Sequence, residues 1–125
     1  MAKEESSDEK KQDLGKRTAR FAQAITAFAG RVPVNPVTRP LIRQLVDAGT
    51  SIDANYGAAE DPESGRDFRH KIGVVKKEAR ETKYWLRMIA SAEPTMKPDA
   101  RPLWQEAKEL HLIFARIFRS SKQGD

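Results

Sequence analysis

The sequence predicts an all-α protein that folds as an antiparallel up-and-down four-helix bundle. Apolar residues recur at intervals of three, four or seven in four separate stretches, which places them on one face of a helix in each stretch. The connections between these stretches are about 5 to 10 residues long, and such short connections favour antiparallel neighbours. No stretch shows the alternating pattern of a half-buried strand.

The first two helices follow directly from this spacing. The apolar face of the first helix consists of Leu14, Phe21, Ile25, Phe28 and Val32. Pro33 and Pro36 end this helix because proline lacks a backbone N–H and disfavours helical geometry before it. We expect Thr38 to cap the second helix. The apolar face of the second helix consists of Leu41, Leu45, Ala48, Ile52 and Tyr56. Gly49 indicates a close helix contact, since glycine costs a helix about 1 kcal/mol relative to alanine.

The third and fourth helices have the clearest patterns. Residues 59–65 form a loop, and either Ser64 or Asp67 can cap the third helix. Its apolar positions alternate by four and three: Phe68, Ile72, Val75, Ala79, Thr82, Leu86 and Ile89. Residues 92–98 end this helix, and Asp99 is the expected cap of the fourth. The fourth helix repeats the alternation at Leu103, Ala107, Leu110, Phe114 and Ile117.

The composition is typical of one domain in a reducing cytoplasm. The chain has 125 residues, of which 38% are apolar and 33% charged, and it has no cysteine. We expect a charged, disordered tail over residues 1–12, the bundle over residues 13–121 and a short tail over residues 122–125. No signal peptide or membrane span is expected. Basic residues exceed acidic ones by five, which makes polyanions candidate partners.

The third helix carries a row of cations that we call the basic ridge. Its members are spaced by seven, four, three and four residues, about 90° around the helix from the apolar face: Arg69, Lys76, Arg80, Lys83 and Arg87. Such a row suits phosphate groups, since lysine and arginine release counterions without base-specific geometry. The alternative is a solvated face that is balanced by acids on neighbouring helices. We expect Lys97 and Lys108 to lie away from the ridge.

Two further clusters flank the apolar faces. The first extends the apolar arcs of the last two helices and indicates an oligomer interface or a partner site: Trp85, Met88, Trp104 and Phe118. Alternatively, the two tryptophans cover one monomeric core. The second cluster consists of Asn55, Glu81 and Thr82, which we interpret as a structural hydrogen-bond network rather than a proton-transfer site.

The sequence contains no pattern typical of an enzyme, a cofactor site or a metal site. His70 and His111 lie on different helices, and the paired Glu-x-x-His motifs of di-metal bundles are absent. No phosphate-binding glycine loop and no Gly-x-Ser-x-Gly motif occurs. We therefore expect a protein without catalytic activity, cofactor or metal.

Three segments resemble a known family, namely Gly49–Tyr56, Arg66–Gly73 and Glu78–Leu86. The chain is similar to the four-helix-bundle proteins encoded by intervening sequences in bacterial 23S ribosomal RNA genes. This resemblance implies a ring-like homopentamer without established enzymatic activity and with a proposed role in nucleic-acid binding. The accessory protein of diversity-generating retroelements is similar in fold, and there a basic pentamer partners a reverse transcriptase and RNA.

Two functions are consistent with these observations. The first is a non-catalytic oligomer whose basic ridge binds RNA or a nucleoprotein partner such as a reverse transcriptase. The second is a structural or protein-interaction module without direct nucleic-acid binding, in which the positive charge is incidental. The salt dependence of RNA binding separates them, because only phosphate neutralisation makes affinity fall steeply with salt.

Overall fold

The structure, a computed structural model, describes residues 7–121 of the chain and the side chains of residues 13–121. The described residues form four α-helices, one short 3₁₀ helix and no strand. Their bounds are α1 (Ser7–Arg31), α2 (Thr38–Ala59), α3 (Gly65–Ala92), η1 (Pro94–Met96) and α4 (Lys97–Ser120). The prediction of an all-α protein with four helices is therefore confirmed.

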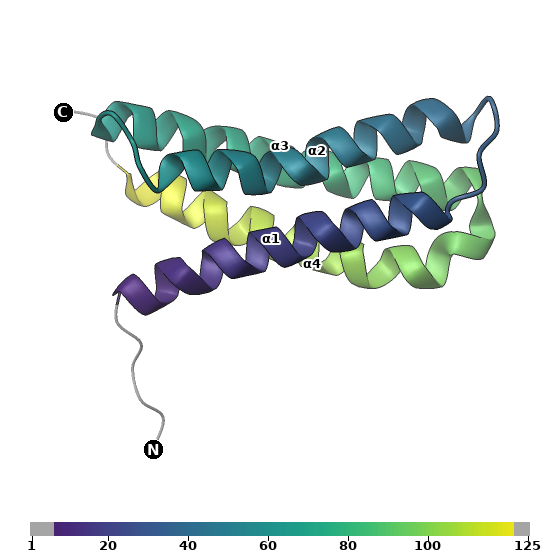
Figure 1. The fold of residues 1–125 in the computed structure, drawn as a ribbon, viewed down its shortest axis with the longest axis horizontal. Helices are drawn as coiled ribbons and strands as arrows, with labels where there is room; N and C mark the ends of the chain where they lie inside the picture. The colour runs from purple at the N-terminus through teal and green to yellow at the C-terminus, as the bar shows by residue number, and fades with distance from the viewer. Residues whose placement is uncertain (1–6, 122–125) are drawn as a thin grey trace, which may run out of the picture.

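The four helices lie side by side along one long axis (Figure 1). The connection between α1 and α2 and the connection between α3 and α4 lie at one end, and the connection between α2 and α3 lies at the other. Helix α3 packs against both α2 and α4, whereas α1 packs mainly against α2 and makes only a small contact with α4. Helix α3 is thus the central element, and its two flanks contact different neighbours.

Helix α1 begins at Ser7, upstream of the expected start of the folded part at Asp13. Glutamate, lysine and glutamine are good helix formers, so a helix that is anchored downstream can extend through them without burying an apolar face. The expected tail therefore overlaps with α1 over residues 7–12. Residues 1–6 and 122–125 lie outside the described part of the chain.

The predicted apolar faces form one core. The largest fully buried side chains include Phe28 of α1, Ile52 of α2, Leu86 of α3 and Phe114 of α4. Residues at the ends of the stripes are half-buried and pack against this core: Leu14, Leu41, Phe68, Leu103 and Ile117. Each fully buried side chain of this size contributes about 1.5–3 kcal/mol to folding. Burial of the apolar faces therefore drives the association of the helices.

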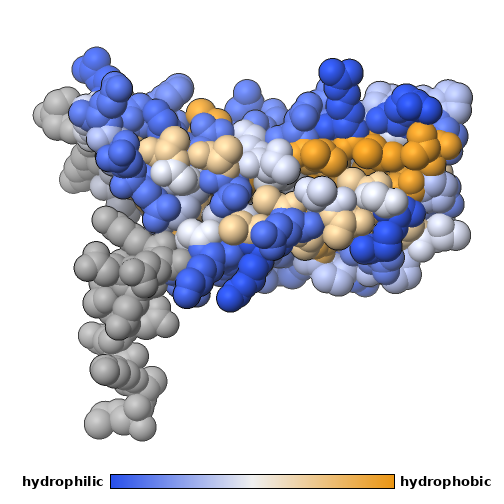
Figure 2. Space-filling view, viewed as in Figure 1, coloured by the Kyte–Doolittle hydropathy of each residue, from blue (hydrophilic) through white to orange (hydrophobic). Residues whose placement is uncertain are grey.

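Apolar side chains are exposed in one region of the molecular surface. Figure 2 shows apolar side chains over the N-terminal half of α2 and the connection before it, on a face that is otherwise mostly hydrophilic. Val34 and Val37 of this connection are 61% and 62% exposed, and Ile42 and Val46 of α2 are half-buried. These residues lie on α2 and its preceding connection, away from the basic ridge of α3.

The start of α2 corrects the expectation that Thr38 is its cap. The side-chain Oδ1 of Asn35 accepts hydrogen bonds from the N–H groups of Val37 and Thr38, both at 2.9 Å, and so performs the capping function. The hydroxyl of Thr38 instead accepts from the N–H of Asn35 at 2.9 Å and donates to the carbonyl of Pro33 at 2.7 Å. The two side chains thus stabilise the connection reciprocally, in the manner of a capping box.

Replacing Thr38 with valine is expected to lower the free energy of unfolding by about 1–3 kcal/mol, because two hydrogen bonds of about 0.5–1.5 kcal/mol each are lost. Thr82→Val is the matched control. Both threonines are 0% exposed, but the Thr82 hydroxyl donates only to the Glu78 carbonyl of its own helix. Urea denaturation measures both variants, and equal losses of stability would contradict this interpretation.

The remaining helix starts confirm one expectation and correct another. Ser64 caps α3, since its hydroxyl accepts from the N–H of Asp67 at 3.0 Å. Asp99 does not cap α4, because η1 leads into the helix and places Asp99 within the first helical turn. Met96 precedes α4 and makes no side-chain capping bond.

Candidate nucleic-acid interface on α3 and α4

The basic ridge lies on the flank of α3 that faces α4. Three of its members contact aromatic rings of α4: Arg69, Lys76 and Lys83. Arg80 and Arg87 are exposed. Arg87 lines a pocket with Trp104 of α4, whereas Arg80 lines one with Trp85 of α3 and Gln44 of α2. At about 1.5 Å per residue the ridge extends over about 27 Å, which is long enough to contact several phosphates of one strand.

Arg69 is held at one end of the ridge by two contacts with α4. Its Nε donates a hydrogen bond of 2.6 Å to the carbonyl of Ser121, and its Cζ lies 3.8 Å from the centre of the Phe118 ring. The Nζ of Lys76 lies 4.7 Å from the centre of the same ring. Phe118 packs directly over Gly73, where a Cβ would stand 3.0 Å from its Cε2. The missing side chain at Gly73 therefore allows the Phe118 ring to pack closely against α3, beside Arg69 and Lys76.

The other end of the ridge is organised around Trp104. The Nζ atoms of Lys83 and Lys108 each lie 5.7 Å from the centre of this ring. Lys97 and Arg87 line a pocket of about 520 Å³ beside the same tryptophan. The expectation that Lys97 and Lys108 lie away from the ridge is therefore wrong, because α4 packs alongside the ridge and adds its own cations to this surface.

None of the five ridge cations forms an ion pair with a carboxylate among residues 13–121. The ion pairs of this part of the chain involve other cations: Arg17 with Glu106 and Glu109, Arg31 with Asp99, Lys71 with Asp67, and Lys77 with Glu81. Acids on the neighbouring helices thus do not balance the ridge by direct pairing. Cations without a paired carboxylate favour a negatively charged partner.

The strongest of these ion pairs joins α1 to α4 and was not anticipated from the sequence. The guanidinium of Arg17 donates from Nε and Nη2 to the two carboxylate oxygens of Glu106, each at 2.7 Å. Hydrogen bonding to Glu106 raises the pKa of Arg17 despite the opposing effect of burial. This pair connects two helices whose backbones make few close contacts, and the spacing within either helix does not reveal it.

The four predicted interface residues do not gather in one patch. Trp104 and Phe118 lie in the α3–α4 seam beneath the ridge cations, and both pack against the core. Trp85 lies on the other flank of α3, where it lines a pocket with Gln44 of α2 and packs edge-on against Tyr84 with ring centres 4.8 Å apart. Met88 is half-buried. The Trp104 Nε1 atom is buried without a hydrogen-bond partner among the described residues.

The predicted polar network has different central members. Thr82 is buried, but its hydroxyl bonds within α3. Asn55 donates from Nδ2 to the carbonyl and to the hydroxyl of Ser51, both at 2.9 Å. Ser51 also influences Glu78 of α3, because it lowers the pKa of that carboxyl group against the larger opposing effect of burial. The polar groups that come together between α2 and α3 are therefore Ser51 and Glu78, which could not be predicted from the apolar stripes because neither residue lies on one.

Burial raises the pKa of Glu78, with a further contribution from its neighbour Glu81. A carboxyl group whose folded pKa exceeds its unfolded value stabilises the fold at low pH, and this contribution is lost as the pH rises through the folded value. Glu78→Gln is thus expected to be more stable than the parent at pH 7 and equally stable well below pH 4. Denaturation midpoints at both pH values test this expectation, with the exposed Glu63→Gln as the control. A constant difference at both pH values would contradict it.

Neither histidine forms part of a metal cluster in the described region. The Nδ1 of His111 lies 3.0 Å from the carbonyl of Lys76, and His70 is exposed. Among the described residues no group of three or more histidine, aspartate or glutamate side chains could hold a metal ion. No helix between residues 7 and 121 has both the length and the apolar character that a bilayer crossing requires.

A family comparison confirms the resemblance seen in the sequence. The sequence model of the 23S rRNA-intervening sequence protein family matches residues 10–116. The chain belongs to this family. This match includes the whole basic ridge and Trp104, whereas Phe118 follows the matched region.

A solved structure shows the same fold. A protein of unknown function from the S23 ribosomal protein family of Bacteroides thetaiotaomicron superimposes with a TM-score of 0.76. The two sequences are 24% identical, and the match covers 88% of this chain and 98% of the other. At this identity the likeness establishes the fold. No curated protein matches the chain.

Proposed function

We propose that this family member is a non-catalytic, oligomeric four-helix bundle that binds RNA, alone or within a nucleoprotein, through the basic ridge. The observation that carries this proposal is that three of the five ridge cations lie over aromatic rings and that none of the five forms an ion pair with a carboxylate among residues 13–121. A solvated structural face would be expected to contain opposing acids.

The chemistry of the ridge suits the RNA backbone rather than particular bases. Lysine and arginine neutralise phosphates and release condensed counterions, a contribution that does not depend on sequence. Lys108 of α4 widens the ridge at Trp104, so that the cations come from two helices. Specificity for one RNA would then be provided by the shape of the RNA or by a protein partner.

The family resemblance leads us to propose an antiparallel topology and a ring-like homopentamer. The placement of the connections at alternate ends supports the topology (Figure 1). In a ring, the ridges of successive copies would repeat around the symmetry axis, and several weak phosphate contacts would combine into one multivalent surface. Trp85, which lines a pocket with Gln44 of α2, and the half-buried Met88 are the predicted interface residues available for the contact between copies. A mass of one subunit by light scattering at micromolar concentration would exclude this assembly.

A salt titration of RNA binding tests the proposed function. If about five phosphates are neutralised per site, the logarithm of the affinity falls with the logarithm of the salt concentration at a slope of about −3.5 to −4.5. A slope near zero, or no binding near physiological salt, would overturn the proposal. Protein docking without direct RNA contact would then be the better interpretation.

A further inference from the structure

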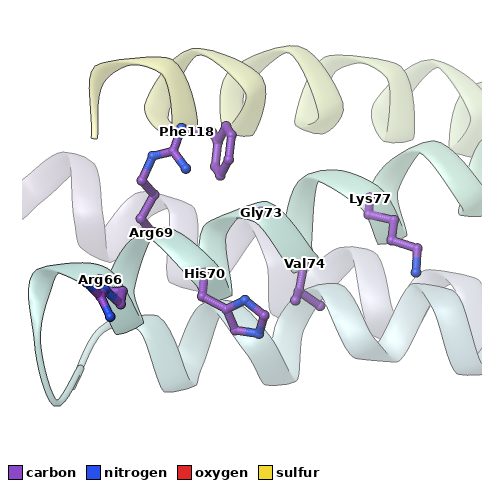
Figure 3. Close-up of a pocket in the computed structure, with 7 residues that line it drawn as sticks. All are labelled: Arg66, Arg69, His70, Gly73, Val74, Lys77 and Phe118. Carbon is purple, nitrogen blue, oxygen red and sulfur yellow. The ribbon is translucent and has the colours of Figure 1, made fainter. Parts of the chain in front are cut away.

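A pocket of about 610 Å³ lies at the Arg69 end of the ridge, between the first half of α3 and the C-terminal end of α4 (Figure 3). Its charged lining consists of Arg66, Arg69 and Lys77, together with His70. Its apolar lining consists of Gly73, Val74 and the ring of Phe118. Pockets of this size are typical of small-molecule sites that combine an apolar surface with a few polar groups.

The pocket is positively charged throughout, because no carboxylate lines it. The nearest acid in the first turn of α3, Asp67, is engaged by Lys71 at 2.6 Å. The Nζ of Lys77 lies 3.9 Å from Glu81, but both side chains are largely exposed, and an exposed pair at this distance compensates little of the lysine charge. The electrostatics therefore favour an anion with more than one negative charge.

Arg69 is already held in a conformation suited to such an anion. Its Nε is occupied by the Ser121 carbonyl and one face of its guanidinium rests on Phe118, whereas its terminal nitrogens make no hydrogen bond to residues 13–121. The planar fork of arginine matches the oxygens of a phosphate, and a side chain that is ordered before binding loses less entropy when it binds. The aromatic and aliphatic lining beside this fork offers a surface for a base or a ribose.

We propose that this pocket binds a nucleoside 5′-monophosphate, either free or as the 5′ end of an RNA. A terminal phosphate monoester carries close to two negative charges at pH 7, whereas an internal phosphodiester carries one, so three cations around one pocket favour the terminal group. The phosphate lies between Arg66 and Arg69, and the base contacts the surface of Val74 and Phe118. Lys77 lies at the opposite end of the pocket, about three helical turns from Arg66, and adds positive charge there. Binding of an RNA 5′ end rests on the proposed function, whereas binding of a free nucleotide does not.

Calorimetric titration with adenosine monophosphate, adenosine and inorganic phosphate tests the pocket itself. Adenosine and inorganic phosphate are each expected to bind at least tenfold more weakly than the nucleotide. Arg66→Gln combined with Lys77→Gln removes two cations from exposed positions and is expected to weaken nucleotide binding at least tenfold with the helical signal unchanged. Lys16→Gln combined with Arg39→Gln, exposed positions on α1 and α2, is the matched control and is expected to bind like the parent.

A pair of RNA oligonucleotides that differ only in a 5′-phosphate or 5′-hydroxyl distinguishes the two sources. At least fivefold tighter binding of the phosphorylated RNA, lost in the double variant, would identify the RNA end as the ligand. Equal binding of both RNAs with tight binding of the nucleotide would identify the free nucleotide. Equal binding of adenosine and its monophosphate, or a double variant that binds like the parent, would overturn the pocket assignment. If the pocket assignment fails but the protein still binds RNA, the proposed function stands. If the protein binds the nucleotide but not RNA, the proposed function fails and the pocket assignment stands.

Discussion

Lys76→Glu combined with Lys83→Glu is expected to weaken RNA binding roughly a hundredfold, because two charge-assisted phosphate contacts of about 1.5 kcal/mol each are lost. The two lysines lie on α3 over different rings of α4, so the change affects both halves of the ridge. Removing two phosphate contacts should also reduce the magnitude of the salt slope by about two. Single-stranded and structured RNA should be affected alike, since backbone contacts carry no sequence information.

The helical signal and the mass of the assembly should survive this charge reversal. Both lysines are half-buried beside partly exposed rings, and a cation over an aromatic ring contributes only about 0.5–1 kcal/mol at such sites. Lys16→Glu combined with Arg39→Glu changes the net charge equally on α1 and α2 and is the control. If the ridge variant and this control bind RNA equally, overall charge rather than the ridge is responsible, and the ridge assignment fails.

Gly49→Ala is expected to lower the free energy of unfolding by about 1–3 kcal/mol, the range typical of overpacked cores. A Cβ at this position would stand 2.8 Å from Cγ2 of Ile25 and 3.1 Å from its Cβ. Ile25 is 0% exposed and β-branched, so it cannot move aside without displacing α1 from α2. This cost outweighs the gain in helix propensity of about 1 kcal/mol that alanine provides.

Gly57→Ala provides the matched control on the same helix. No atom lies within 4 Å of the Cβ that this substitution would add, and Gly57 is exposed. This variant should therefore gain up to about 1 kcal/mol from helix propensity alone. Thermal or urea denaturation of the two variants should give shifts of opposite sign. A stabilised Gly49→Ala variant would show that α1 and α2 do not pack closely at this point.

The four helices and the core were predictable because they depend on local patterns. The apolar stripes predicted the buried face of every helix, and the residues that are only half-buried, such as Leu14 and Ile117, lie at the ends of the stripes. The close contact at Gly49 was also predictable, since a glycine that costs helix propensity indicates a packing requirement. Caps were predicted less well. Asn35, not Thr38, caps α2, because capping depends on the conformation of the preceding connection.

The sequence by itself determined that this protein is an all-α bundle with one strongly basic helix. Only the tertiary structure decided what the basic ridge faces. Which neighbour lies beside each flank of α3 is set by packing, and this packing places Phe118 and Trp104 rather than acids beneath the ridge cations. The same packing joins Ser51 to Glu78 and Arg17 to Glu106 across helices. Periodicity within a helix reports the direction of each side chain, but a contact between helices also depends on their relative register, which no single helix encodes.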